Sequence, residues 1–562
     1  MSTLTTLKNY YDKLLDALSP RRRGLKRLRA KWGQTVTPGE KDASSTSRYF
    51  DLTRNVSAAQ VSPIRRHGGQ VVDDKTWIDL EFPRIFAGLD STETPLGSQV
   101  LFCRLRCYVE SPSELAEYYA SCEALRIDAP LREEIQLRLA NLQDDSNSQL
   151  ADFIYGENPS VSKYIGLLPW WSLACLATLV TVYMLSLSIW LWLATIGVNL
   201  ILIFQLSLPF HRNIEMLKSC HWMLRVADAL AFIRSDALPP QMISILREAP
   251  QRAKARKALG WIAKPQEPLA ASLRVWLNII FLADMVAYSR TIKQLARVKA
   301  ELAATFESLG SIDAAITVAS YLECLSEHCQ PIISDAAALE IVAGEHPLIK
   351  RPVCNSIHLE GRSALITGSN MAGKTTFIKM IGINIILGRT LGFCLASKAT
   401  LPNSSVMASI RGEHSVESGK SHYFAELEAI HLFIERAQRD ECKVFLIDEL
   451  FNGTNTVERL AAARAVLECL SAYAQVLVTT HDVELQDDLA GIYALYYFQE
   501  DPDVDGYFDY QLRSGKSTKR NAIKLLARKG FASHIVAQAM TYSKHYASLV
   551  GCQLSAKIPK QT

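Results

Sequence analysis

The chain has 562 residues, a length that suits about three or four domains. Its hydrophobic content is 49% and its net charge is +4, too small a charge to indicate a nucleic-acid partner from composition alone. Its twelve cysteines are scattered, and the close pairs Cys103/Cys107 and Cys324/Cys329 lack a second pair at zinc-site spacing. We expect reduced, mostly buried thiols, as in a cytosolic protein, rather than metal ligands or disulfides.

Residues 1–160 are predicted to form a mixed, partly helical N-terminal region, with helical sequence over 113–142. The first ten residues lack the apolar core of a signal peptide. Residues 21–31 hold seven basic side chains and no acidic one. Such a cluster is typical of a site for anionic lipid or nucleic acid, and equally of the solvated basic end of a helix. Both interpretations stay open at this point.

Residues 164–210 contain no charged side chain. A membrane helix needs about 20 apolar residues, so this run is long enough for two spans, predicted over 168–185 and 189–208. Tryptophans open both spans, as expected at membrane interfaces: Trp170 and Trp171 in the first, Trp190 and Trp192 in the second. The alternative is a helical hairpin buried in the core of a soluble protein.

Basic residues lie outside both ends of this hairpin, with Lys163 before it and Arg212 and Lys218 after it. None lies in its turn, so the positive-inside rule places both ends in the cytoplasm. We therefore predict a multi-pass protein of the inner or plasma membrane, with both termini and its other domains cytoplasmic.

Residues 211–335 are predicted to form a helical arm. The stretch 273–304 is nearly unbroken helix-forming sequence, as expected of such an arm. Polar groups such as Asp284 interrupt its apolar part too closely for a third membrane span.

An α/β domain is predicted over 340–515, around a complete G-x4-G-K-[ST] phosphate loop. An apolar run, 363–367, precedes the loop as a buried strand, and a helical segment, 376–381, follows it. Glycines let backbone N–H groups surround an oligophosphate, and the helix N-terminus adds partial positive charge. Lys374 is expected to reach the β- and γ-phosphates of a nucleotide, and the Thr375 hydroxyl to bind Mg²⁺. The predicted nucleotide-binding residues are Gly368, Ser369, Asn370, Met371, Ala372, Gly373, Lys374, Thr375 and Thr376.

Two further strand ends carry candidate catalytic residues. The apolar run 443–447 ends at Asp448, expected to hold Mg²⁺, and Glu449, expected to orient or deprotonate the attacking water. The run 475–480 ends at His481, which could contact the γ-phosphate or that water. Each strand end alone is also typical of an ordinary structural turn, but the phosphate loop favours the functional interpretation.

Residues 418–427 predict a fourth part of the site. Gly419, Lys420 and Ser421 are expected to begin a helix that contains Glu426, and such a helix start binds anions. In one class of ATPase it caps the γ-phosphate bound by the opposite subunit. The alternative is an ordinary capped surface helix.

Together these residues resemble the MutS ATPases of DNA mismatch repair. The loop 367–376 is similar to the family's T-G-P-N-M-G-G-K-S-T, and its Asn370-Met371 pair is the specific element. Further segments resemble family motifs in the same order: 344–347 (G-R-H-P), 419–426 (G-R-S-T-F-M-x-E), 448–455 (D-E-x-x-x-G-T-S/N), 480–481 (T-H) and the tail 522–531 (A-x-x-A-G-L/F-P).

The resemblance implies an ATPase that uses ATP and Mg²⁺, with Glu449, His481 and Lys374 catalytic. It also implies a homodimer, supported by the tail, in which Ser421 of one subunit closes over the ATP of the other. Ser369 and Ala372 stand where the family has Pro and Gly, and no mismatch-reading Phe-x-Glu lies in the N-terminal region. DNA is therefore a candidate partner without a visible mismatch-specific motif.

We thus predict a multidomain fold. Helical N-terminal and arm regions carry a two-helix transmembrane hairpin, and a P-loop NTPase domain of MutS/ABC type and a helical dimerisation tail, 516–562, follow. The predicted function is that of a membrane-anchored MutS-like ATPase. One alternative is a transporter-type ATPase with a fused membrane segment, for which two spans are few. Another is an ATP-gated membrane scaffold without mismatch recognition. A third is a non-catalytic scaffold that binds DNA or lipid through residues 21–31, which the intact Asp448-Glu449 pair disfavours.

Overall fold

The chain is described by a computed structural model in which two compact units form. The first unit contains residues 1–333 and 384–395, and the second contains 334–383 and 396–562. The structure describes residues 19–34, 70–142, 150–156, 167–185, 188–233, 249–260, 268–369, 371–410, 422–451, 455–500, 508–516 and 530–543.

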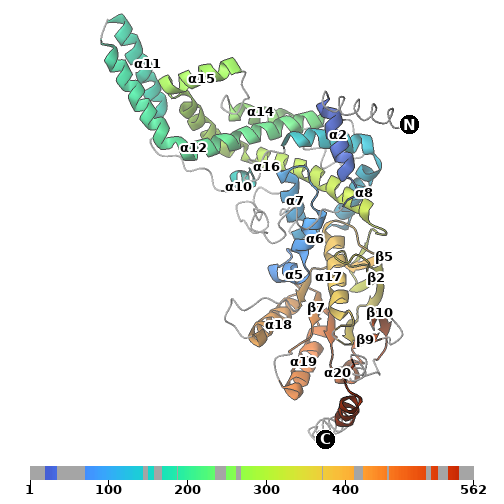
Figure 1. Cartoon of the computed structure of the whole chain (residues 1–562). Helices are drawn as coiled ribbons and strands as arrows, with labels where there is room; N and C mark the ends of the chain where they lie inside the picture. Colours follow the sequence, from blue (N-terminus) through green and yellow to red (C-terminus); the bar gives the residue numbers. More distant parts are fainter. Residues whose placement is uncertain are drawn as a thin grey trace, which may run out of the picture. The chain divides into compact units, whose positions relative to one another are not determined.

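The first unit is helical (Figure 1). Its long helix α16 (Ala283–Cys324) is buried along most of its C-terminal half, where α7 and α8 pack against it. The other helices are α2 (Pro20–Lys31), α5 (Asp74–Asp79), α6 (Phe82–Leu89), α7 (Pro95–Arg106), α8 (Pro112–Ile127), α9 (Ala129–Leu139), α10 (Leu150–Tyr155), α11 (Leu168–Met184), α12 (Ile189–Ala231), α14 (Ala249–Leu259) and α15 (Pro268–Phe281).

Local sequence explains where several of these helices begin. Thr94, Ser111 and Asp128 each precede a helix with proline in its first turn, and each side chain accepts a hydrogen bond from a backbone N–H of that turn. The cap at Asp128 also separates α8 from α9. The helical stretch predicted over 113–142 is confirmed, and this side-chain cap divides it into successive helices.

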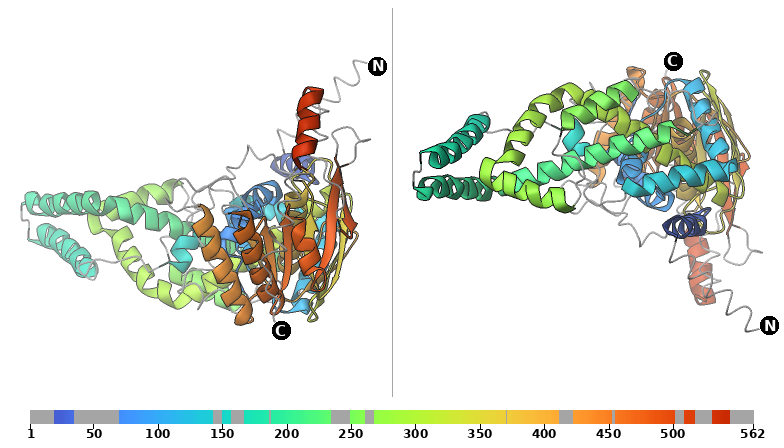
Figure 2. Two further views of the ribbon diagram at one scale, coloured as in Figure 1. Left: turned by 90° about the horizontal axis from the view of Figure 1, so that it is seen from below. Right: turned by 90° about the horizontal axis from the view of Figure 1, so that it is seen from above.

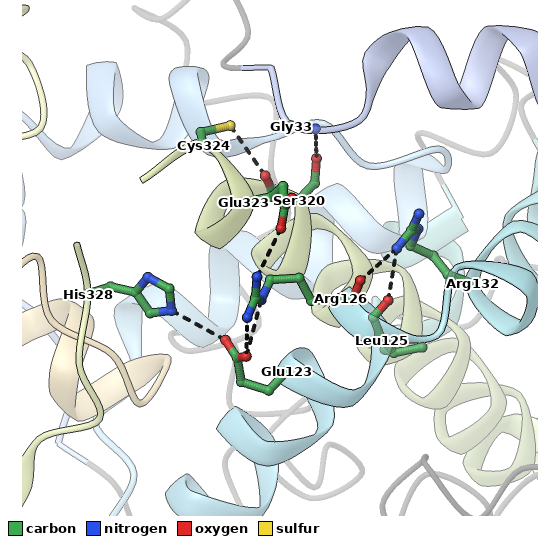
Figure 3. Close-up of polar contacts among 9 residues, drawn as sticks. All are labelled: Gly33, Glu123, Leu125, Arg126, Arg132, Ser320, Glu323, Cys324 and His328. Atoms are coloured by element: carbon green, nitrogen blue, oxygen red, sulfur yellow. Dashed lines mark hydrogen bonds and ion pairs between the residues drawn. The ribbon is translucent and has the colours of Figure 1, made fainter. Parts of the chain in front are cut away.

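The basic cluster 21–31 lies on α2, and several of its arginines are paired within the first unit. Arg21 and Arg29 contact Glu134 and Glu133 of α9 at 2.8 and 2.6 Å, and Arg27 contacts Glu93 at 2.7 Å. A second group of ion pairs joins α8 to the end of α16, where Arg126 bridges Glu123 and Glu323 (Figure 3). The contacts of α2 favour the structural interpretation of the basic cluster.

A buried carboxylate on α16 caps α7. Asp313 accepts hydrogen bonds from the backbone N–H groups of Glu93 and Thr94 at 3.1 and 2.8 Å, and from the Thr94 hydroxyl at 2.6 Å. Burial nevertheless outweighs these bonds and raises the pKa of Asp313 to about 7.

This shift predicts a pH-dependent stability. A carboxyl whose pKa is raised on folding stabilises the protein below its unfolded pKa, near 4, and loses that contribution as pH rises to about 7. We expect the unfolding free energy of the wild type to fall over this window, by on the order of a few kcal/mol, relative to Asp313→Asn. Thermal unfolding of both proteins from pH 4 to 8 measures it, and a constant difference in Tm would contradict it.

Helix α11 and the first part of α12 form a hairpin that projects from the other helices of the first unit (Figures 1 and 2). Many of its large apolar side chains are exposed, including Trp170 (72%), Tyr183 (80%), Trp190 (75%) and Phe204 (82%). A hairpin buried in a soluble core does not match these exposures. Among the described helices, only α16 is long and apolar enough to pass as a membrane span, but 89% of its most apolar window is buried within the protein. Helix α16 is therefore a core helix, while α11 and residues 189–204 of α12 are shorter apolar helices.

The stretch 273–304 is helical, as expected, with one break at Leu282. This residue has a left-handed backbone (φ 52°) and separates α15 from α16. It is fully buried beside Leu168 and Met285, with Leu202 packed against the same cluster. The Asn199 amide of α12 donates hydrogen bonds to the carbonyls of Ile279 and Ile280 at 3.1 and 2.8 Å. Burial of the Leu282 side chain and the hydrogen bonds to these carbonyls offset the free-energy cost of breaking the helix.

The second unit contains two sheets. A four-stranded sheet has the order β1-β5-β2-β3, with β1 (Ile332–Ser334), β2 (Ala338–Gly344), β3 (Asn355–Glu360) and β5 (Lys398–Pro402). A six-stranded sheet has the order β10-β9-β4-β8-β7-β6. Its strands are β4 (Ser363–Thr367), β6 (Val406–Ser409), β7 (Val444–Asp448), β8 (Gln475–Thr480), β9 (Tyr493–Glu500) and β10 (Phe508–Ser514).

The six-stranded sheet carries the larger described core of this unit. Strands β4, β7 and β8 are buried along their whole length, as expected of central parallel strands covered on both faces. The helices of the unit are α17 (Lys374–Thr390), α18 (His422–Gln438), α19 (Thr456–Ser471) and α20 (Glu484–Leu489), and residues 533–543 are also helical. The predicted α/β domain is confirmed.

Candidate active site

Three neighbouring parallel strands end side by side at the site. Strand β8 lies between β4 and β7, with Thr367 opposite Thr480 and Asp448 opposite Thr479. Because these strands are parallel and in this register, the segments that follow them meet at one edge of the sheet. The three strand ends singled out in the sequence are therefore brought together.

The phosphate loop connects β4 to α17. Gly368 and Gly373 have φ values of 149° and 99°, which side chains rarely adopt. A Cβ at Gly368 would lie 2.9 Å from the carbonyl oxygen of Phe498, and one at Gly373 would lie 3.2 Å from the ring of Tyr510. Both glycines are thus required by the path of the loop.

Lys374, the first residue of α17, is almost fully buried. Its Nζ donates a hydrogen bond to the Gly368 carbonyl at 2.6 Å and lies 3.8 Å from Glu449 Oε1. Burial lowers the pKa of Lys374, and the carboxylates of Glu449 and Asp448 partly oppose this shift. The ammonium group therefore lies within the loop, where a phosphate oxygen would offer a better partner than a carbonyl.

Asp448 and Thr375 provide oxygen atoms suited to Mg²⁺. The Thr375 hydroxyl donates to Asp448 Oδ2 at 2.8 Å, and the Thr479 hydroxyl donates to Asp448 Oδ1. Magnesium usually takes one or two protein oxygens and completes its shell with water and substrate phosphates. Thr375 and Asp448 fit this donor set, and Thr479 orients the carboxylate.

Glu449 lies in a strained turn directly after β7. It has a left-handed backbone (φ 54°), as does Phe451 (φ 59°). Its N–H donates to the Thr479 carbonyl at 3.0 Å, and its buried carboxylate lies 3.7 Å from His481 Nδ1. Glu426 of α18 accepts a hydrogen bond from the Phe451 N–H at 2.6 Å. This bond ties α18 to the turn that carries Glu449.

The segment after β8 is held by an ion pair. Arg459 of α19 donates two hydrogen bonds to Asp482, at 2.7 and 3.1 Å, and both side chains are largely buried. Gln486 of α20 donates to the Thr367 hydroxyl at the end of β4, at 2.9 Å. These contacts position the backbone that follows His481, whose own ring is partly exposed.

A cavity of about 460 Å³ adjoins the phosphate loop, a size typical of small-ligand sites. Its lining includes His346, Ile349, Val353, Met371, Phe377 and Tyr510. Thr375 and Gly373 also line it, so the cavity is continuous with the phosphate loop. Its apolar and aromatic walls suit the base and ribose of a nucleotide.

Most predicted site residues are thus found together, and two lie outside the described residues. Lys374, Thr375, Asp448, Glu449 and His481 surround one point at the edge of the sheet. Asn370 and Ser421 belong to the part of the chain that the structure does not describe. Met371 is exposed at the cavity, whereas Ala372 is buried.

Sequence reasoning missed Thr479, Gln486 and Tyr510. Thr479 precedes the predicted His481 by two residues, so the rule that parallel strands end together could have found it. Gln486 and Tyr510 gave no signal, because their contacts depend on how α20 and β10 pack.

Comparison with known proteins agrees with this geometry. Residues 364–547 match MutS domain V. The chain is 32% identical over 248 residues to the endonuclease MutS2 of Streptococcus equi subsp. equi, covering 42% of this chain and 31% of that protein. It is 30% identical over 207 residues to the DNA mismatch repair protein MutS of Thermus aquaticus, covering 36% of this chain and 25% of that protein.

The chain is also 28% identical over 229 residues to the DNA mismatch repair protein MutS of Leuconostoc mesenteroides, covering 38% of this chain and 26% of that protein. In each case the chain spans less than a third of the relative's length. The matched region contains the strands and loops of the site described above. Residues 364–547 of this chain therefore form a domain similar to domain V of the MutS proteins.

Proposed function

We propose that this chain is an ATPase that binds ATP with Mg²⁺ at the end of β4, β7 and β8. The observation that carries the proposal is the meeting of Lys374, the Thr375–Asp448 pair and Glu449 at one edge of the sheet. The adjoining cavity accommodates the nucleoside part. The match of residues 364–547 to MutS domain V supports the same proposal of ATP binding and hydrolysis.

Each residue has a distinct role in this proposal. Lys374 and the loop N–H groups bind the β- and γ-phosphates, and Thr375 and Asp448 hold Mg²⁺, which neutralises phosphate charge. Glu449 accepts a hydrogen bond from the attacking water and aligns it with the γ-phosphate. His481 lies beside Glu449 and can contact the same water or the γ-phosphate.

Replacing the loop lysine tests the assignment. Lys374→Ala removes a charge-assisted contact worth about 1.5–3 kcal/mol, so we expect ATP affinity to fall roughly ten- to a hundredfold and turnover to be lost. Lys398→Ala is the matched control, because Lys398 is exposed and pairs with Glu340 away from the site. Equilibrium ATP binding and phosphate release measure both effects. Unchanged affinity and turnover in Lys374→Ala would rule out the assignment.

The dimer and the DNA partner belong to this proposal as well. Relatives of this chain are DNA mismatch repair and endonuclease proteins, which supports DNA as a partner. In the proposed dimer, Ser421 of one subunit contacts the γ-phosphate held by the other. Sedimentation of the purified chain with ATP and with ADP tests for a nucleotide-dependent dimer. Binding to mismatched, branched and plain duplexes tests for DNA.

We also propose that the α11–α12 hairpin inserts into the inner or plasma membrane, with the ATPase domain and both termini in the cytoplasm. Its support is the 47-residue stretch without a charge, 164–210, and the exposed apolar side chains along both helices. Exposed apolar surface of this extent is costly in water and favourable in lipid. ATP-driven rearrangement would then act at a membrane, or on DNA held near one.

A further inference from the structure

A second cavity, also of about 460 Å³, lies at the foot of the hairpin. The beginning of α11, the end of α14 and the junction between α15 and α16, all in the first unit, line it. These helices are labelled in Figure 1. Its lining includes Ser172, Lys257, Phe281, Val286 and Arg290. None of these residues belongs to the nucleotide site.

The cavity is basic. Lys257 and Arg290 line it with exposed side chains, and neither makes an ion pair or side-chain hydrogen bond with the described residues. The nearby acids are already paired: Asp284 contacts Arg274 at 2.6 Å, and Asp228 contacts Arg252 and Arg256 at 2.8 and 2.7 Å. No acidic residue is among the described residues that line the cavity. The positive charges of Lys257 and Arg290 therefore line the same cavity without an acidic partner among the described residues.

The rest of the lining is suited to lipid. Phe281 and Val286 are apolar, and alanines at 258, 283 and 287 complete that part of the wall. Ser172 belongs to the same first turns of α11 as Trp170 and Trp171, where the hairpin would enter the headgroup region. On α15, the helix that contributes Phe281 to the cavity, the apolar side chains of Leu273 and Trp276 are also exposed. A ligand with an anionic head and an apolar body fits this arrangement.

We infer that this cavity binds the phosphate headgroup of an anionic phospholipid, with Lys257 and Arg290 contacting the phosphate and Phe281 and Val286 contacting the glycerol and upper acyl chains. Basic pockets between helices on the cytoplasmic side of a membrane are suited to such headgroups. The inference rests on the proposed membrane insertion of the hairpin. It adds a lipid preference that insertion alone does not require.

The test uses the full chain purified in detergent and mixed with equimolar phosphatidylglycerol and phosphatidylcholine. Native mass spectrometry measures which lipid stays bound. We expect the wild type to retain phosphatidylglycerol preferentially, and Lys257→Ala/Arg290→Ala to lose that preference roughly tenfold or more. Lys254→Ala/Lys293→Ala is the matched control, since it removes one exposed cation from each of the same helices outside the cavity. The double variant Lys257→Arg/Arg290→Lys keeps a cation at each position and should retain the preference for phosphatidylglycerol.

The outcomes separate the possible explanations. If the double alanine variant and the wild type retain the two lipids alike, the cavity is not a lipid site. Displacement of the lipid by excess inorganic phosphate would show a site for free phosphate instead, which also overturns the inference. Co-flotation with vesicles of phosphatidylcholine alone tests insertion of the hairpin without the headgroup preference. If the wild-type protein floats with these vesicles but shows no preference between the two lipids, the headgroup site is ruled out. The proposed insertion of the hairpin is then still supported.

Discussion

Replacing Glu449 with Gln is expected to reduce ATP turnover by about 10²–10⁴-fold while ATP still binds. The substitution keeps the size of the side chain and removes the charge that polarises the attacking water. Glu449 follows β7 and lies 3.8 Å from the loop residue Lys374, and the substitution changes no residue of the phosphate-binding loop itself. Phosphate release under saturating ATP measures turnover, and equilibrium binding measures affinity.

The control for this variant is Glu468→Gln. Glu468 is an exposed residue of α19 that pairs with Arg464, and it lies on the same unit as the site. Wild-type turnover in Glu449→Gln would exclude Glu449 as the base. A parallel loss of ATP affinity would instead assign it to nucleotide binding, and His481 would become the next candidate to orient the water.

Two lysines placed in the hairpin are expected to prevent its stable insertion into a membrane. Leu176 and Leu200 lie near the middle of the two apolar helices and are exposed by 45% and 49%. A lysine near the centre of a span costs about 2.5–3.5 kcal/mol, so Leu176→Lys/Leu200→Lys should release most of the full chain from the membrane pellet in an alkaline wash. In water, these exposed positions should tolerate lysine.

Val457→Lys/Ile492→Lys provides the matched control, because both side chains are similarly exposed, by 40% and 42%, in the ATPase domain. This variant should stay in the pellet like the wild type. ATP binding in detergent verifies that both variants are folded. A wild-type chain that the wash itself releases, or a hairpin variant that resists it, would contradict membrane insertion.

The parts of the site that the sequence predicted are those in which short segments carry their own chemistry. The buried strands before the loop, before Asp448 and before His481 were predicted from apolar runs, and all three are confirmed. The phosphate loop was predicted from glycine spacing, and the φ values of Gly368 and Gly373 explain that spacing. Such patterns are local. Glycine spacing reflects the backbone conformation of one loop, and an apolar run reflects the burial of one strand.

Other features were beyond the sequence because they depend on distant partners. The break at Leu282 lies in good helix-forming sequence, and it is stabilised by burial against α11 and by Asn199, which is about 80 residues away in the chain. The contact between Glu426 and the turn after Glu449 likewise joins separate segments. The second, basic cavity is formed by three segments with no common motif.

The sequence by itself therefore determined the motifs of the candidate nucleotide site: a phosphate loop, two acids at the end of one strand and a histidine after another, each placed by local backbone preference. Only the tertiary structure decided that β8 separates β4 from β7, that Thr479 orients Asp448, and that Lys257 and Arg290 face one cavity. The physical reason is that strand order, helix breaks and uncompensated charges are set by which distant surfaces are buried together. Local sequence does not encode that outcome in any single segment.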